Sequence, residues 1–196
     1  MALPDCDTLF SKYFLPWFGE QDRKRRVFQA TRPDIEQLEV PDDMTASDVS
    51  PLTAEGQSDV ASRIADMLEA ATVDWKEFLP MGDTPSTTWV AEFDRHFQRP
   101  RIQEVLKRSE ATRFDNDYLV LCCELGAVLG TVLRAVEPQL CWLYDWPYWE
   151  SGLYCQKTRM RINVFHWAIK KLSEYGVEDD LAAKIAACQR VLHPEP

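Results

Sequence analysis

The sequence contains little glycine, with seven in 196 residues, and this scarcity disfavours glycine-rich loops that bind phosphate groups. It contains no phosphate-binding loop, no dinucleotide fingerprint and no serine in a G-x-S-x-G turn. Its three histidines are isolated from one another, and no two are four residues apart on a helix. We therefore expect no catalytic residues and no enzymatic activity.

The six cysteines form no C-x-x-C pair, and none has zinc-ligand spacing to a histidine. Cys122 and Cys123 are adjacent in an apolar run, where each acts as a small hydrophobic residue. We expect neither a metal nor another cofactor. Free cysteines are typical of a reducing compartment, and the sequence shows no signal-peptide pattern. These features predict a cytoplasmic protein.

Positive charge is scarce, because 22 basic residues face 32 acidic ones and the net charge is −10. Such a chain is poorly suited to nucleic acid or to an anionic membrane surface, so we expect neither as a partner. The longest apolar stretch is interrupted by Glu124 and is expected to be too short to span a bilayer. Acidity can serve solubility alone, or it can attract a basic protein.

Negative charge is concentrated in residues 34–62, which contain eight acids and no lysine or arginine. Pro33, Pro41 and Pro51 punctuate this stretch, so most of it is expected to be an extended or loop connection. We expect a single domain over residues 1–196, with residues 1–52 as a candidate loosely attached segment.

Apolar residues at helical spacing predict helices over 53–71 (with an extension towards 78), 87–97, 102–106, 116–136, 165–175 and 178–192. The helix over 116–136 is apolar nearly all round and should be the central buried helix. Its Gly126 and Gly130 are tolerable if another backbone, such as a sheet, packs closely on that face. Three short strands, at 140–144, 151–154 and 160–164, are expected to form an antiparallel meander. The predicted class is α+β, mostly helical, with this small three-stranded sheet.

Glu124 is unusual because it interrupts the apolar helix. Burial should raise the pKa of its carboxyl unless a cation such as Arg134 or Arg161 pairs with it. It can also lie at an exposed edge of the helix, or take part in catalysis.

Asp145 and Glu150 lie among aromatic residues, and three interpretations are open. They can be the acid–base pair of a glycosidase, a partner-binding patch, or turn residues beside a core. We selected the second interpretation and combined these residues with acids of the 34–62 stretch. The predicted partner-binding residues are Asp42, Asp43, Asp48, Asp145, Trp146, Tyr148, Trp149 and Glu150.

The stretch from Leu125 to about Leu181 resembles known domains. It contains Leu125-Gly126-x-x-Leu129-Gly130, an aromatic strand with Trp142, and Asn163-Val164-Phe165 before a helix with Lys170-Lys171. This is similar to small bacterial domains of unknown function that have a G-x-x-x-G helix, a short meander and a V-F-x-x-x-x-K helix. Such domains occur near polymorphic toxins and resemble immunity proteins. The resemblance implies a fold and a functional setting, but no catalytic residues.

The leading hypothesis is therefore an immunity-type protein that binds and neutralises a basic toxin or effector, for instance one delivered by type VI secretion. Its mechanism would be steric and electrostatic occlusion. One alternative is an adaptor or chaperone for a secreted effector. Another is a hydrolase that uses Glu124, Asp145 or Glu150, which requires these carboxylates to meet in one pocket.

Overall fold

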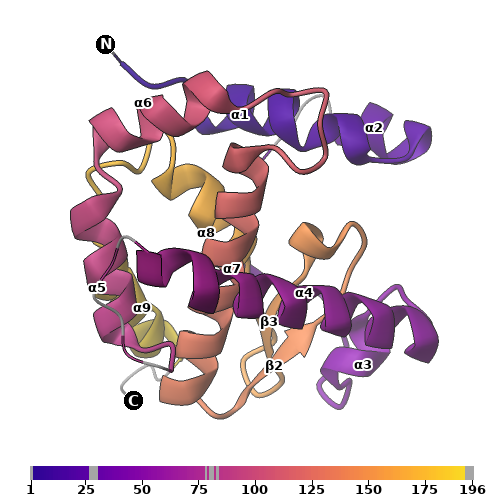
Figure 1. The fold of residues 1–196 in the computed structure, drawn as a ribbon. Coiled ribbons are helices and arrows are strands. Elements are labelled where there is room, and N and C mark those ends of the chain that lie inside the picture. Colours follow the sequence, from indigo (N-terminus) through magenta and orange to yellow (C-terminus); the bar gives the residue numbers. More distant parts are fainter. Residues whose placement is uncertain (1, 27–30, 78, 80–81, 83, 193–196) are drawn as a thin grey trace.

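The computed structural model describes residues 2–26, 31–77, 79, 82 and 84–192 of the chain. Most of these residues are helical, and a small antiparallel sheet lies among the helices (Figure 1). The predicted α+β, mostly helical class is confirmed, although the sheet has four strands and not three. The helices are α1 (Cys6–Tyr13), α2 (Glu20–Arg26), α3 (Ala46–Val49), α4 (Ala54–Asp74), α5 (Thr87–His96), α6 (Arg99–Arg108), α7 (Asp117–Val136), α8 (Val164–Lys171) and α9 (Leu181–Leu192).

Helix α7 is the central element, as its composition predicts. The side chain of Asn116 caps its first turn by accepting a hydrogen bond from the amide of Leu119 at 3.0 Å. In Figure 1, α7 runs through the middle of the molecule, and α4 crosses it while α8 lies alongside. The core is a single cluster of buried hydrophobic residues from α1, from α4 to α9 and from the sheet.

The two glycines of α7 make room for aromatic rings and not for a neighbouring backbone. A Cβ atom on Gly126 would lie 2.2 Å from the ring of Phe165 at the start of α8, and one on Gly130 would lie 2.3 Å from the ring of Trp142. The close approach that the sequence suggests is therefore real, but the neighbours are side chains.

The sheet has the order β1-β4-β3-β2, with all neighbours antiparallel. The expected meander is formed by β2 (Leu140–Leu143), β3 (Gly152–Cys155) and β4 (Met160–Ile162). The additional strand β1 (Ile35–Gln37) comes from the acidic stretch that was expected to be an extended or loop connection, and Ile35 pairs with Ile162. Pairing with β4 at the sheet edge, and not local propensity, makes this segment a strand.

The N-terminal segment is not loosely attached, contrary to our expectation for residues 1–52. On α1, the side chains of Phe10, Tyr13 and Phe14 are fully buried. Phe10 stacks against His166 of α8, with ring centroids 5.5 Å apart. Because these aromatic rings fill part of the common core, removing this segment would expose that core to solvent.

One of two helix ends agrees with the sequence-based expectation and the other does not. The final helical turns of α4 pass into a short 3-10 helix, Trp75–Glu77, which agrees with the expected extension. Helix α8 ends at Lys171 and not near Tyr175. The amide of Glu174, which would continue the helix by donating to the carbonyl of Lys170, donates instead to the carbonyl of Pro4 at 3.0 Å.

By length and composition alone, α7 could cross a membrane, so our expectation that no stretch is long enough is wrong. It is the one such helix in the described part of the chain. In this fold 72% of its most apolar window is buried against other elements, as in the core helix of a globular domain.

Candidate functional site

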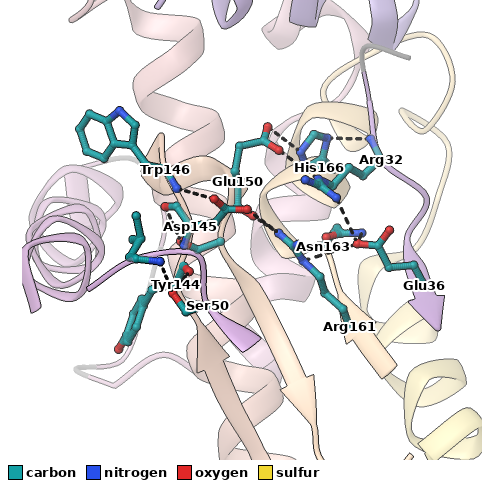
Figure 2. A network of polar contacts seen from close by, with 12 residues as sticks. Arg32, Glu36, Ser50, Tyr144, Asp145, Trp146, Glu150, Arg161, Asn163 and His166 are labelled. Atoms are coloured by element: carbon teal, nitrogen blue, oxygen red, sulfur yellow. Dashed lines mark hydrogen bonds and ion pairs between the residues drawn. The ribbon is translucent and has the colours of Figure 1, made fainter. Parts of the chain in front are cut away.

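A surface hollow of about 450 Å³ lies beside Trp146, and we refer to it as the Trp146 pocket. The hydroxyl of Ser50 donates to the carbonyl of Tyr144 at 2.6 Å, which holds the segment before α4 against the loop after β2. Figure 2 shows Trp146, Asp145 and Glu150 projecting from this loop and the short 3-10 helix Tyr148–Glu150 that follows it. The lining residues are Phe18, Asp22, Arg32, Pro51, Leu52, Asp145, Trp146 and Glu150.

Behind the pocket, the carboxylate of Glu150 is almost completely buried and has partners at both oxygens. Its Oε2 accepts from Nε of Arg32 at 3.0 Å, and its Oε1 lies 3.2 Å from Nε2 of His166 (Figure 2). A buried carboxylate is tolerated where it is paired in this way. Glu150 is therefore fixed in position by Arg32 and His166.

The other nitrogen of His166 determines its protonation. The backbone N–H of Arg32 donates to Nδ1 of His166 at 3.0 Å, so Nδ1 has no proton and Nε2–H donates to Glu150. The imidazole is fully buried. Both ring nitrogens thus have partners within the protein, and the imidazole links Arg32 to Glu150.

Arg161 lies on the other side of Glu150 and is also buried. Its guanidinium donates to the carbonyl of Glu150 and lies 3.5 Å from Glu36 and 3.8 Å from Asp145. Burial, and next the charge of Arg32, lower the pKa of Arg161 to about 10, so it stays charged at neutral pH. Arg32 pairs with Glu150 and Glu36, and Arg161 pairs with Glu36 and Asp145. These ion pairs hold the three carboxylates in position.

Trp146 is the residue that the pocket presents to solvent. Its side chain is 54% exposed, and the guanidinium of Arg63 on α4 lies 5.5 Å from the ring centroid. Asp145, beside it, is partly exposed and accepts a hydrogen bond from the amide of Trp146 at 2.7 Å. An exposed indole next to carboxylates has the composition of a binding hot spot.

Three of the predicted partner-binding residues are not on the surface, and we correct their assignment. Tyr148, Trp149 and Glu150 are buried. Trp149 packs edge-on against Phe14 of α1, with ring centroids 5.5 Å apart, and so belongs to the core. Of the two acids for which three interpretations are open, Glu150 lies beside the core, whereas Asp145 is partly exposed.

The remaining predicted residues do not form one patch. Asp42 and Asp43 are exposed and lie against the turn after β3, where Asp42 pairs with Arg159 at 2.8 Å. Asp145 and Trp146 lie at the other end of the same strand pair, because Leu140 is opposite Cys155 and Leu143 opposite Gly152. Asp48 is exposed on α3, where its carboxylate accepts from the amide of Thr45 at 2.9 Å.

A larger acidic face continues along α4. Glu55, Asp59, Asp66 and Glu69 are exposed, and their spacing puts them on one side of the helix. Arg63, beside Trp146, is the only basic residue between positions 33 and 75. The acids up to Asp59 were recognised from the sequence as a cluster, but Asp66 and Glu69 were not. The helical periodicity of residues 55–69 could have indicated that the stripe continues to them.

Glu124 does not join these carboxylates. It is 3% exposed, and its Oε2 accepts from Nε1 of Trp75 at 2.8 Å, not from Arg134 or Arg161 as suggested by the sequence. It lines a separate cavity with Asp74, whereas Asp145 and Glu150 line the Trp146 pocket. The convergence that a hydrolase using all three would require is therefore not present.

Sequence reasoning also missed Arg32, Arg161 and His166 as parts of one polar cluster. Positions 32, 150 and 166 are brought together only by the tertiary fold, and no local spacing indicates them. Among the described residues, no group of three or more His, Cys, Asp or Glu side chains is placed to hold a metal ion.

Comparison with known proteins found no match: no protein family model, curated protein or solved structure matches this chain.

Proposed function

We propose that this protein is an immunity-type inhibitor that binds a basic bacterial toxin or effector in the cytoplasm and blocks it by occlusion. The observation that carries the proposal is Trp146, 54% exposed at the edge of a pocket of about 450 Å³ that Asp22, Asp145 and Glu150 help to line. Tryptophan is enriched among residues that dominate binding energy, and it acts best where neighbours exclude water around it.

Pre-organisation supports the same proposal. The Trp146 loop is fixed at Ser50, Asp145 and Glu150, so little conformational entropy is lost when a partner docks on it. The hydroxyl of Ser151 completes this support, because it accepts from the amide of Asp145 at 3.0 Å.

Charge supports the choice of partner. Exposed acids lie on α3 and α4, the helices that neighbour the Trp146 loop: Asp48, Glu55, Asp59, Asp66 and Glu69. Arg63 is the one basic residue among them. Such a face accelerates association with a positively charged surface and disfavours acidic partners. A toxin whose cleft binds nucleic acid or another anion would present that positive surface, and its occlusion requires no chemistry by the inhibitor.

The experiment produces this chain together with the protein encoded by the adjacent gene in a sensitive bacterial host. Rescue of growth and a direct complex in titration calorimetry are the expected results. Trp146→Ala should weaken binding at least roughly 30-fold, the loss for a tryptophan hot spot of about 2 kcal/mol. Tyr175→Ala is the matched control, because Tyr175 is 67% exposed but does not line the pocket.

Two results would count against the proposal. A complex that leaves the partner fully active would identify an adaptor or chaperone. Equal affinities of the Trp146→Ala and wild-type proteins would mean that the partner docks elsewhere, even if growth is rescued.

A further inference from the structure

A second cavity, of about 190 Å³, lies between the end of α4, the α5–α6 pair and α7, and we refer to it as the Glu124 cavity. Its apolar walls include the buried side chains of Phe97, Val105 and Leu121. Its charged lining residues are Asp74, Arg101, Arg108, Asp117 and Glu124. This cavity shares no lining residue with the Trp146 pocket.

The carboxyl of Glu124 has one oxygen in use and one spare. Oε2 accepts the indole N–H of Trp75 at 2.8 Å. Oε1 is buried and accepts no hydrogen bond from any residue that the structure describes. When Glu124 is protonated, its O–H can bond to the neighbouring carboxyl of Asp74; when it loses the proton, Oε1 becomes a buried acceptor that a ligand's N–H can satisfy.

Each arginine of the cavity has a carboxylate partner, although Nε of Arg101 is buried and donates to no residue that the structure describes. Arg108 lies 3.3 Å from Asp117, and Arg101 lies 2.9 Å from Glu104. Asp74 and Glu124, two neighbouring carboxyls, are the acidic lining residues that pair with neither arginine. Burial, and to a smaller extent the charge of Asp74, raise the pKa of Glu124 to about 8, against the opposing effect of the Trp75 hydrogen bond. At neutral pH most Glu124 side chains therefore keep their proton, and a bound cation would favour its loss.

We propose that the Glu124 cavity binds a primary alkylammonium ion, with the nitrogen between Asp74 and Glu124 and the alkyl chain against Phe97, Val105 and Leu121. An ammonium group has three N–H donors and one positive charge, which match the spare oxygen and the two neighbouring carboxyls. An anion would face the two carboxyls, and a hard metal ion would find too few oxygen ligands between these apolar walls.

The size of the cavity restricts the ligand. A water-sized group takes about 30 Å³, so the cavity accommodates about six non-hydrogen atoms. Butylammonium is of this size, and 1-butanol has nearly the same shape without the charge. Because this site does not involve Trp146, its test is independent of the proposed inhibitor function.

The experiment titrates butylammonium into the full chain and follows the indole N–H signal of Trp75 by NMR, since that group donates to Glu124. We expect a saturable shift, an affinity that increases from pH 6 to pH 8 as Glu124 loses its proton, and little effect of 1-butanol. Glu124→Gln keeps an acceptor for Trp75 but removes the charge, and should weaken binding roughly tenfold or more and abolish its pH dependence.

Asp74→Asn, at an exposed position, provides a second variant in case Glu124→Gln alters the fold, and it should also weaken binding. Asp66→Asn is the matched control, because it removes one exposed α4 carboxylate that does not line the cavity. Three results would overturn the proposal: no shift at millimolar butylammonium, equal binding of 1-butanol, or wild-type affinity in both the Glu124→Gln and Asp74→Asn proteins.

Discussion

The backbone N–H of Arg32 donates to Nδ1 of His166, 3.0 Å away, across 134 positions of sequence. This bond fixes the imidazole as the Nε2–H tautomer, which then donates to Glu150. It also ties the segment before β1 to α8. The side chain of Arg32 returns to Glu150 at 3.0 Å, so the backbone and side chain of one residue both bind the cluster (Figure 2).

Replacing His166 with alanine should therefore be strongly destabilising. The change removes a fully buried side chain, leaves the Arg32 amide without its acceptor and takes one donor from Glu150. We expect the free energy of unfolding to fall by about 2 to 4 kcal/mol, measured by urea denaturation. The exposed Phe114→Ala, at 45% exposure, should cost far less. A loss for His166→Ala no greater than that control would contradict a stabilising role for the cluster.

Glu124 should make stability fall as pH rises. Its folded-state pKa is about 8, above the ordinary 4.5, so between these values the unfolded chain releases a proton that the folded chain keeps. The unfolded state binds fewer protons there, and the free energy of unfolding decreases by up to about 1.4 kcal/mol per pH unit. Above about pH 8 this contribution becomes constant.

The measurement is the difference in unfolding free energy between wild type and Glu124→Gln from pH 4 to pH 9. The variant should gain on the wild type as pH rises towards 8. Asp74→Asn should reduce the effect, since it removes the neighbouring charge that raises the Glu124 pKa. A difference that does not vary with pH would show that Glu124 titrates normally.

Gly126→Ala should destabilise the protein although alanine favours helices. The new Cβ would lie 2.2 Å from the Phe165 ring, which is buried and has little freedom to move. Overpacking of this kind costs about 1 to 3 kcal/mol, against a helix-propensity gain of about 1 kcal/mol. We expect a net loss for Gly126→Ala and a smaller one for Gly130→Ala, because Trp142 is only partly buried.

The control for both is Gly56→Ala in α4, where the nearest atom would be 3.4 Å away in ordinary contact. Its stability should be unchanged or higher. Thermal unfolding of the Gly126→Ala, Gly130→Ala and Gly56→Ala proteins would rank their stabilities. A Gly126→Ala protein as stable as the Gly56→Ala protein would mean that Phe165 has room to shift.

The acidic stripe on α4 should control how fast a partner associates, and not how long it stays. Neutralising Asp59, Asp66 and Glu69 should lower the association rate several-fold and flatten its dependence on salt, with a nearly constant dissociation rate. Neutralising the exposed Glu104, Glu110 and Glu178 changes the net charge equally. Surface plasmon resonance with the cognate partner can compare the two variants, and equal association rates would argue against steering by α4.

Local sequence patterns predicted the helical elements well, for reasons that are visible residue by residue. Asn116 caps α7 as its side chain allows, and the spacing of Leu181, Ile185, Cys188 and Leu192 puts the buried face of α9 on one side. The aromatic strands β2 and β3 were also found. In each case the signal lies within a few turns or one strand of chain.

Long-range relationships were missed. β1 is a strand because it pairs with β4, more than 120 positions away, while its own composition favours a loop. Trp149 and Trp146 are three residues apart and equally hydrophobic, yet one is 1% and the other 54% exposed. Trp149 is buried because Phe14 of α1 packs against it. The sequence near Trp149 does not predict this contact.

Composition and short-range periodicity were enough to predict the acidic character, the central apolar helix and most of the other helices, whereas the burial of Glu124 became clear only from the structure. Which carboxylates lie close to one another depends on the tertiary structure. It separated Glu124 from Asp145 and Glu150, joined Glu150 to Arg32 and His166, and left Trp146 exposed. Burial and ionic pairing depend on contacts between segments that are distant in the chain, and such contacts form only when the whole core is packed.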